Sequence, residues 1–300
     1  MIIHFPRNLR TDKKGIEFLS FLWGVSKKNK NNTLYWNLKR TKKIETNLLS
    51  FLGLVLKRMD NRKNIIKLIT KNNDGQVVIV NENILMFIFE KYSSHNNKLL
   101  QYKFLSEKES KEDMNILLIG GLKEFNLLYY SDIKILLSEF IANIFMHATD
   151  REGSISGYIT DKDEILISVC NMGKTIRQNI EEINKYKFLT DREAIVWALK
   201  KTNTTRKNEE SGGLGLYLLR KYIFKIHAEA IIISGKSLVK LSGENCFNEL
   251  KVNDIYLEDD IEMKGFFPGT IITLKFKNEK NYMINNKIYL HEIELFNWRR

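Results

Sequence analysis

The chain has 300 residues, 43% hydrophobic and 28% charged, a composition that excludes a disordered chain and predicts about two domains of ~100–200 residues each. Its apolar runs fall short of the ~20 residues that span a bilayer, and its two cysteines form no metal or disulfide spacing. We therefore expect a cytoplasmic protein without membrane contact, whose formal net charge is +12.

The net positive charge comes entirely from the first part of the chain. Residues 1–110 hold 21 Lys and Arg against 9 Asp and Glu, and the remaining residues hold 27 of each kind. A basic domain can bind nucleic acid or an acidic partner. The alternative is a Lys- and Asn-rich composition bias without a binding role.

Residues 1–110 alternate between short apolar runs and helix-sized segments. The pattern predicts extended segments at residues 2–5, 33–38, 65–69 and 77–80, and helices at 16–25, 48–59 and 84–92. We expect Thr46 or Asn47 to cap the middle helix. Such alternation indicates an α/β layer fold. The charge-rich stretch 103–115 predicts the boundary between this domain and the next.

Residues 111–280 form the expected second domain, and residues 281–300 a polar C-terminal tail. Apolar periodicity predicts helices at 133–148, 191–201 and 214–225 and strands at 230–234 and 270–276. Residues 154–160 and 164–169 predict a hairpin around the polar turn 161–163.

The helix over residues 133–148 is apolar on nearly all sides, so we expect it to be buried. Yet Glu139, Asn143 and His147 recur every four residues on one of its faces. A buried carboxylate needs a polar partner, and a metal ion, ordered water and phosphate would serve. A solvent-facing edge with local hydrogen bonds is the alternative.

Two glycine-containing segments follow. Asn171-Met172-Gly173 comes directly after a predicted strand, where a glycine allows a sharp turn or close approach to a ligand. The second segment, residues 211–216, opens an apolar helix whose first N–H groups could bind phosphate. The second segment is neither a Walker loop nor a Rossmann fingerprint, and a flexible loop is the alternative reading.

Taken together and in this order, four segments resemble the motifs of the GHKL (Bergerat-fold) ATP-binding superfamily. Residues 137–148 resemble its N box, residues 167–176 its first glycine box, residues 211–216 its second, and residues 267–270 its closing Gly-Thr. The resemblance implies an α/β sandwich with a mixed sheet carrying helices on one face. It also implies that the chain binds ATP and Mg²⁺.

The resemblance implies a role for each matching residue. Glu139 would position or deprotonate the attacking water, and Asn143 would hold Mg²⁺. The glycines would present N–H groups to the phosphates, residues 204–206 would form a lid, and Thr270 would lie near the adenine. The implied nucleotide-binding residues are Asn143, His147, Asn171, Gly173, Thr175, Thr204, Thr205, Arg206, Gly212, Gly213, Leu214, Gly215 and Thr270.

Two positions depart from the family pattern, and one histidine stays open. Asn171 stands where the first glycine box carries an Asp that accepts a hydrogen bond from adenine. The Asn oxygen can still accept that bond, but its NH₂ cannot. Thr175 replaces the second Gly of the box, which narrows the predicted pocket. His147 faces phosphate or ribose in one reading, and the core or solvent in the other.

The first domain more faintly resembles a STAS-like domain, the fold of anti-sigma-factor antagonists, through residues 34–38 and 47–53. The combination is typical of a bacterial regulatory protein with a protein partner; homodimer formation stays open. We expect an ATPase whose nucleotide state drives a conformational change. The alternatives are a protein kinase of the histidine-kinase or anti-sigma type, a non-catalytic nucleotide sensor, and a nucleic-acid binder acting through the basic first domain.

Overall fold

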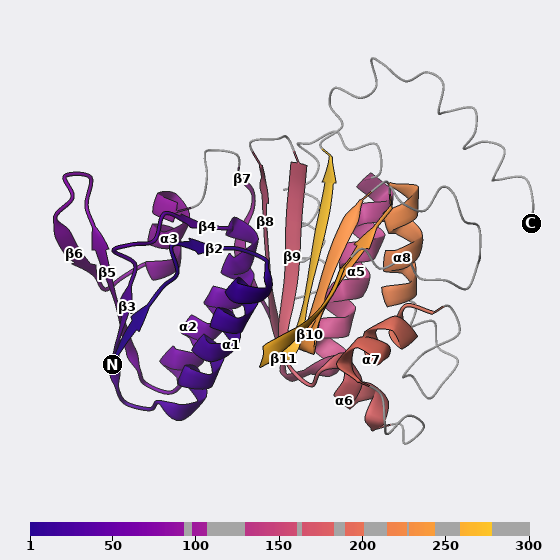
Figure 1. Cartoon of the computed structure of the whole chain (residues 1–300), viewed down its shortest axis with the longest axis horizontal. Helices are drawn as coiled ribbons and strands as arrows, with labels where there is room; N and C mark the ends of the chain where they lie inside the picture. The colour runs from indigo at the N-terminus through magenta and orange to yellow at the C-terminus, as the bar shows by residue number, and fades with distance from the viewer. Residues whose placement is uncertain are drawn as a thin grey trace, which may run out of the picture.

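The computed structural model describes residues 1–92, 98–106, 130–160, 164–182, 190–200, 215–226, 228–243 and 259–277. These residues form an α/β protein with two sheet-based units side by side. Figure 1 shows four layers in order: the first sheet, helices α1 and α2, the second sheet, and the helices of the second unit. The predicted α/β class is confirmed.

The first unit has a four-stranded mixed sheet in the order β1-β3-β5-β6, with β1, β3 and β5 parallel and β6 antiparallel to β5. Its other two strands, β2 and β4, form a small parallel pair. The elements are β1 (Ile2–His4), β2 (Asn8–Leu9), α1 (Lys13–Lys28), β3 (Thr33–Asn37), β4 (Lys43–Ile44), the 3₁₀ turn η1 (Thr46–Leu48), α2 (Leu49–Asn61), β5 (Ile65–Lys71), β6 (Val77–Val80) and α3 (Ile84–Tyr92).

The second unit has a five-stranded sheet in the order β10-β11-β9-β8-β7. Its strands are β7 (Lys98–Ser106), β8 (Ala148–Ile159), β9 (Glu164–Gly173), β10 (Glu229–Ser242) and β11 (Asp259–Lys277). Its helices are α5 (Tyr130–His147), α6 (Ile176–Glu181), α7 (Asp191–Ala198) and α8 (Gly215–Lys225). The predicted helices and strands are thus confirmed with shifted ends, and β2, β4, η1, β7 and α6 are additional.

Two expectations about the second unit need correction. The sheet expected to be mixed is antiparallel throughout its described strands, and the short connection between Ile159 and Glu164 requires this of β8 and β9. The chain also enters this sheet before the predicted boundary at residues 103–115, since Lys98, the first residue of β7, lies opposite Tyr158 of β8.

The expected helix cap at Thr46 or Asn47 is also wrong. Leu48 occupies the N-cap of α2 and makes no side-chain cap bond. Thr46 and Asn47 instead lie within η1, and the Asn47 Nδ2 donates to Thr11 Oγ1 at 2.9 Å and to Ser168 Oγ at 3.1 Å. The Asn47 side chain, which the sequence suggests as a local helix cap, therefore bonds to β9 instead.

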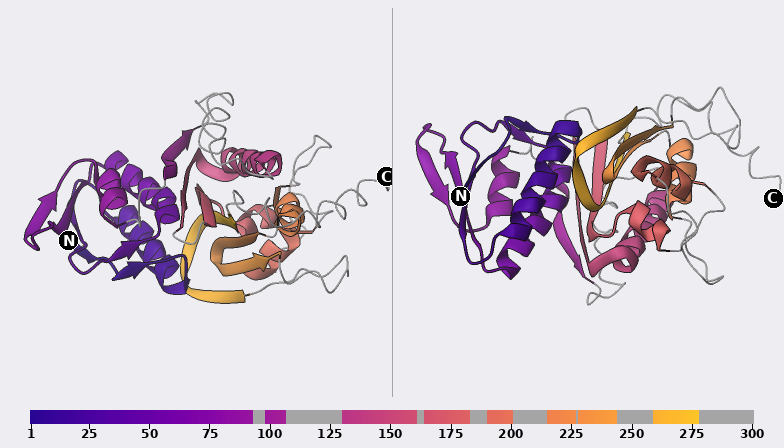
Figure 2. Two further views of the ribbon diagram at one scale, coloured as in Figure 1. Left: turned by 90° about the horizontal axis from the view of Figure 1, so that it is seen from above. Right: turned by 60° about the horizontal axis from the view of Figure 1, so that its bottom comes forward.

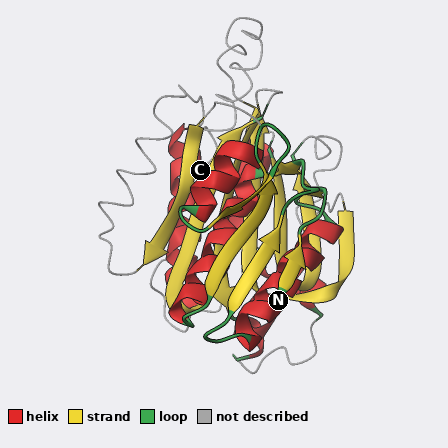
Figure 3. Cartoon of the chain, turned by 90° about the vertical axis from the view of Figure 1, so that its left-hand side faces the viewer, coloured by secondary structure: helices red, strands yellow, loops and turns green. Residues whose placement is uncertain are grey.

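Each face of the second sheet is covered. Helices α5 and α8 pack on one face around a core that includes Phe140 and Ile167. Helices α1 and α2 of the first unit pack on the opposite face, where Phe51 of α2 lies 5.3 Å from the Phe267 ring centroid. The two views of Figure 2 keep α1 and α2 next to the second sheet, and Figure 3 looks along the stack of layers from the first unit.

Hydroxyl groups hold the two units together within this apolar interface. Ser156 Oγ donates to the Asn47 carbonyl at 2.8 Å and accepts from the Ser50 N–H at 3.0 Å. Ser154 Oγ donates to the Ser50 carbonyl. These side chains are fully buried, so the first unit forms an integral layer of the molecule.

Candidate functional site

Three polar residues form a row across neighbouring strands at one end of the second sheet. Asn171 of β9 lies opposite Thr270 of β11, and Thr270 lies opposite Ser234 of β10. Two residues away along these strands, Val169, Ile272 and Ile232 belong to the core under the helices. Because side chains alternate along a strand, the polar row lies on the same helix-covered face.

The backbone around this row requires glycine. Gly269 has φ +118°, and a Cβ there would lie 2.2 Å from the Asn171 carbonyl oxygen. Gly173 has φ +145° and ends β9 just before the chain turns into α6. The positive φ of Gly173 is a conformation that glycine favours, and the missing Cβ of Gly269 lets β11 approach β9 closely.

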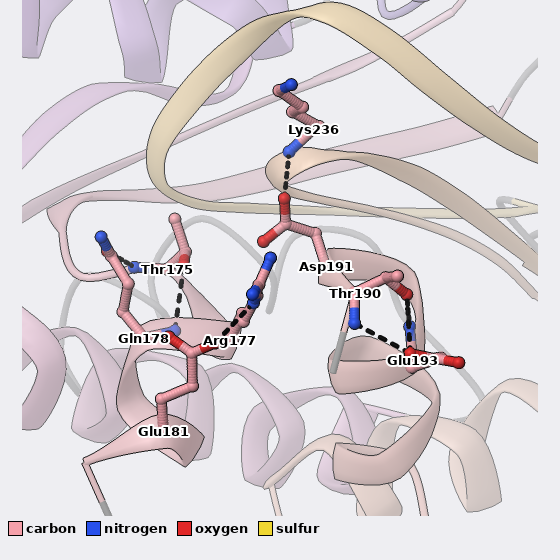
Figure 4. Close-up of polar contacts among 8 residues, drawn as sticks. All are labelled: Thr175, Arg177, Gln178, Glu181, Thr190, Asp191, Glu193 and Lys236. Atoms are coloured by element: carbon pink, nitrogen blue, oxygen red, sulfur yellow. Dashed lines mark hydrogen bonds and ion pairs between the residues drawn. The ribbon is translucent and has the colours of Figure 1, made fainter. Parts of the chain in front are cut away.

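Hydrogen bonds fix the start of α6 against the sheet. Ser234 Oγ accepts from the Ile176 N–H at 3.0 Å and donates to the Gly269 carbonyl at 2.8 Å. Thr175 is 1% exposed, and its Oγ1 accepts from the Gln178 N–H at 3.2 Å in a capping box. Thr175, expected to narrow a pocket, thus caps α6 (Figure 4).

Two acidic side chains of α7 form hydrogen bonds within the chain. Asp191 Oδ2 accepts from the Lys236 N–H at 2.9 Å, beside the β10 bulge at Gly235, as Figure 4 shows. Hydrogen bonds from the Thr190 backbone and hydroxyl lower the pKa of Glu193 below its ordinary value. Asp191 therefore ties α7 to β10, and Glu193 caps the start of α7 through Thr190.

Helix α5 ends next to the polar row. His147 is its last residue, and the following Ala148 lies opposite Gly173. Glu139 and Asn143 are half-buried, one turn of ~6 Å apart. Among the residues that the structure describes, neither side chain has a hydrogen bond or ion pair. The His147 side chain lies outside the description.

Helix α8 runs antiparallel to α5, with its first residue near the same end. Lys225 Nζ at the end of α8 lies 2.6 Å from Asp132 Oδ2 at the start of α5, and the two helices are in contact. Gly215 lies ten residues, or ~15 Å, before Lys225. The same rise along α5 from Asp132 reaches Ala142, so the start of α8 is level with Asn143.

The strand register brings together two of the predicted positions, since Asn171 lies opposite Thr270, and it places Gly173 opposite Ala148, which follows the end of α5. Glu139 and Asn143 lie on α5, and Gly215 begins α8. Ser234 was missed, although a polar residue ending the apolar run 230–233 was a usable signal. The remaining predicted residues lie outside the described part of the chain: Thr204, Thr205, Arg206, Gly212, Gly213 and Leu214.

In comparisons with known proteins, no protein-family model matches this sequence, and no curated protein matches it either. Within the described residues, no helix combines the length and the apolar character needed to cross a membrane. In that same part of the chain, no three His, Cys, Asp or Glu side chains are grouped to hold a metal.

Proposed function

We propose that the second unit binds Mg-ATP at the Asn171 end of its sheet and hydrolyses it, acting as a nucleotide-driven conformational switch in a regulatory system. The proposal rests on two polar side chains of α5. Glu139 and Asn143 are half-buried and have no partner among the described side chains, and their helix ends just before Ala148, which lies opposite Gly173. Because both side chains are partly exposed and carry no bond within the described residues, they are available to a polar ligand.

The start of α8 supports the phosphate end of the ligand. Its first N–H groups carry partial positive charge and have no partner within the helix, as an anion site requires. Asn143 lies at the same level and offers a side-chain oxygen. With no acidic cluster among the described residues, Mg²⁺ would take Asn143, phosphate oxygens and water, and would offset the phosphate charge.

Glu139 supplies the base in this proposal. It lies one turn before Asn143 on the same face of α5. A water oxygen attacks the γ-phosphorus, the bond from that phosphorus to the β–γ bridging oxygen breaks, and ADP leaves. Glu139 accepts the proton that the water loses.

The test compares Glu139→Gln with the wild-type full chain. We expect the variant to bind Mg-ATP with an affinity within about threefold of wild type, but to release phosphate ~10²–10⁴ times more slowly, the usual contribution of a general base. Calorimetry measures the binding, and a phosphate-release assay measures the turnover. Glu90→Gln, an exposed carboxylate on α3, is the matched control and leaves both values unchanged.

Each other outcome counts against part of the proposal. Absence of Mg-ATP binding to the wild type would remove nucleotide binding altogether. Unchanged phosphate release in Glu139→Gln would remove the base role. Binding without phosphate release in the wild type would favour a nucleotide sensor, and transfer of labelled phosphate to a protein would favour a kinase.

A further inference from the structure

The first unit carries a dense basic surface where its parallel strands end. Strands β1, β3 and β5 run in the same direction, so the segments that follow them leave the sheet at one edge. The segments after β1 and β3, residues 7–10 and 39–43, hold six basic side chains and no acidic one: Arg7, Arg10, Lys39, Arg40, Lys42 and Lys43. We call these two segments the basic platform.

Hydrogen bonds hold the two segments of the basic platform together. The Lys42 N–H donates to the Arg7 carbonyl at 2.7 Å, and the Thr41 hydroxyl donates to the Pro6 carbonyl at 3.1 Å. Strands β2 and β4 pair in parallel between the same two segments. The fold therefore brings like charges side by side, and an anionic ligand would relieve their repulsion.

Among the described residues, no carboxylate pairs with the basic platform, and none of its six basic side chains has a hydrogen bond. All of them except Lys43 are exposed. The flanking Asp12 instead accepts from the Gly15 N–H at 2.8 Å, and Glu45 accepts from the Thr11 N–H at 2.7 Å. A composition bias predicts scattered charges, whereas here the chain gathers exposed cations that have no counter-charge within the described residues.

The basic platform borders an open face of the first sheet. Along β1, β3 and β5 buried side chains alternate with more exposed ones, and the outward side chains of these strands and of β6 include no Asp or Glu. Ile65 and Ile79 on this face are 58% and 56% exposed, and Figure 3 looks onto this outermost layer. Tyr35 lies opposite Lys67, two residues or ~7 Å before the end of β3.

We propose that the basic platform and the adjoining sheet face bind single-stranded nucleic acid, with phosphates on the platform and a base stacked on Tyr35. Arginine and lysine side chains are the usual phosphate contacts, and bases stack on aromatic rings beside a basic surface. A single strand uses both the charges and the ring, whereas an acidic peptide needs only the charges.

This surface is remote from the proposed nucleotide site. The first sheet is the outermost layer at one end of the molecule, and the helices of the second unit form the layer at the other end (Figure 1). The inference therefore does not rest on the proposed function, and it can fail or hold independently of Mg-ATP binding.

The experiment measures binding of a labelled single-stranded DNA of ~20 nucleotides to the full chain by fluorescence anisotropy. If three to six platform side chains neutralise phosphates, the dissociation constant should rise about 20- to 300-fold between about 50 and 200 mM salt. A duplex of the same sequence should bind at least about tenfold more weakly, because its paired bases cannot stack on Tyr35.

Two variants separate the charges from the ring. Arg40→Ala combined with Lys42→Ala should weaken binding and lower the salt slope by about 1.4, since each phosphate contact on a single strand contributes about 0.7. Lys27→Ala combined with Lys28→Ala removes the same charge at the far end of α1, ~20 Å away, and leaves the slope unchanged. Tyr35→Ala should weaken binding about 5- to 150-fold with an unchanged slope, and Tyr35→Phe should bind like the wild type.

Circular dichroism checks that each variant is folded. Absence of binding at low salt overturns the proposal, and so does an equal loss in the Lys27 and Lys28 control, which would reflect net charge alone. Equal competition by poly-glutamate would show that the basic platform takes any polyanion, an acidic protein included. Duplex binding as tight as that of the single strand, or unchanged binding by Tyr35→Ala, would remove the base contact and with it the single-stranded ligand.

Discussion

The two faces of the second sheet use buried polar residues in opposite ways. On the face that meets the first unit, each of the hydroxyls of Ser154, Ser156, Ser168 and Thr273 forms a hydrogen bond within the chain. On the helix-covered face, the Asn171 amide has no hydrogen-bond partner among the described residues. The contrast holds for these four hydroxyls and the Asn171 amide; Ser234 on the Asn171 face is engaged, and Asn47 Oδ1 at the first-unit face has no partner in the described part of the chain.

The same strands carry both kinds of group at adjacent positions. Cys170 and Met172 pack in the core shared with the first unit, and Asn171 between them belongs to the opposite face. Burial raises the pKa of the Cys170 thiol well above its ordinary value. The first unit therefore fixes the strand that presents Asn171, without contributing a side chain to the polar row.

The largest effect should come from the apolar part of the first-unit face. Phe51 and Phe267 are both fully buried and in ring contact. Phe51→Ala should lower the free energy of unfolding by about 3–5 kcal/mol, the usual cost of a large cavity. Urea denaturation measures it. Phe21→Ala, at a side chain that is 53% exposed, should cost less than about 0.5 kcal/mol.

The two variants together test whether the first unit packs on the sheet. If Phe51→Ala costs no more than Phe21→Ala, the first unit does not pack on the sheet as described. A double-mutant cycle of Phe51→Ala with Phe267→Ala tests the ring contact itself. Residues in contact give non-additive changes in unfolding free energy, whereas the changes from distant residues add.

The next effect tests the contrast between the faces directly. Ser168 Oγ accepts from Asn47 Nδ2 at 3.1 Å and shares a hydrogen bond with Thr273 Oγ1 at 2.6 Å. Ser168→Ala leaves both partners buried and should cost about 1–3 kcal/mol of unfolding free energy. Asn171→Ala removes a group without a partner and should change it by less than about 1 kcal/mol. Equal losses in the two variants would contradict the distinction.

Local sequence patterns predict most of the helices and strands correctly. The helix that became α5 and the hairpin of β8 and β9 follow from apolar periodicity and a polar turn. Gly173 and the polar pair Glu139 and Asn143 can also be singled out from the sequence, because each interrupts a regular apolar pattern.

Long-range contacts explain what the sequence does not predict. Asn47 is a good local cap by residue type, but its partners Thr11 and Ser168 lie 36 and 121 positions away. The covering of the second sheet by α1 and α2 depends on the same kind of contact. Ser234 joins the site only because β10 lies beside β11, and strand order is not encoded in any local pattern.

The smallest effect concerns the opposite end of the sheet. Lys275 Nζ lies 3.1 Å from Glu164 and 3.2 Å from Glu229. Burial lowers the pKa of Lys275, but the two carboxylates outweigh it and the net pKa is raised. Because the folded pKa lies above the unfolded value near 10.4, the stabilisation is complete below that pH and is lost as the pH rises through the folded pKa.

Partial exposure keeps this contribution below about 1 kcal/mol. Urea unfolding of the wild type and of Lys275→Met between pH 8 and 11 measures it, and the two curves should converge as the pH rises. Nucleotide binding at pH 8 should be the same in both proteins, because Lys275 and the Asn171 row lie near opposite ends of the stretch in which β11 pairs with β9. A binding defect in Lys275→Met would show that the two ends of the sheet are coupled.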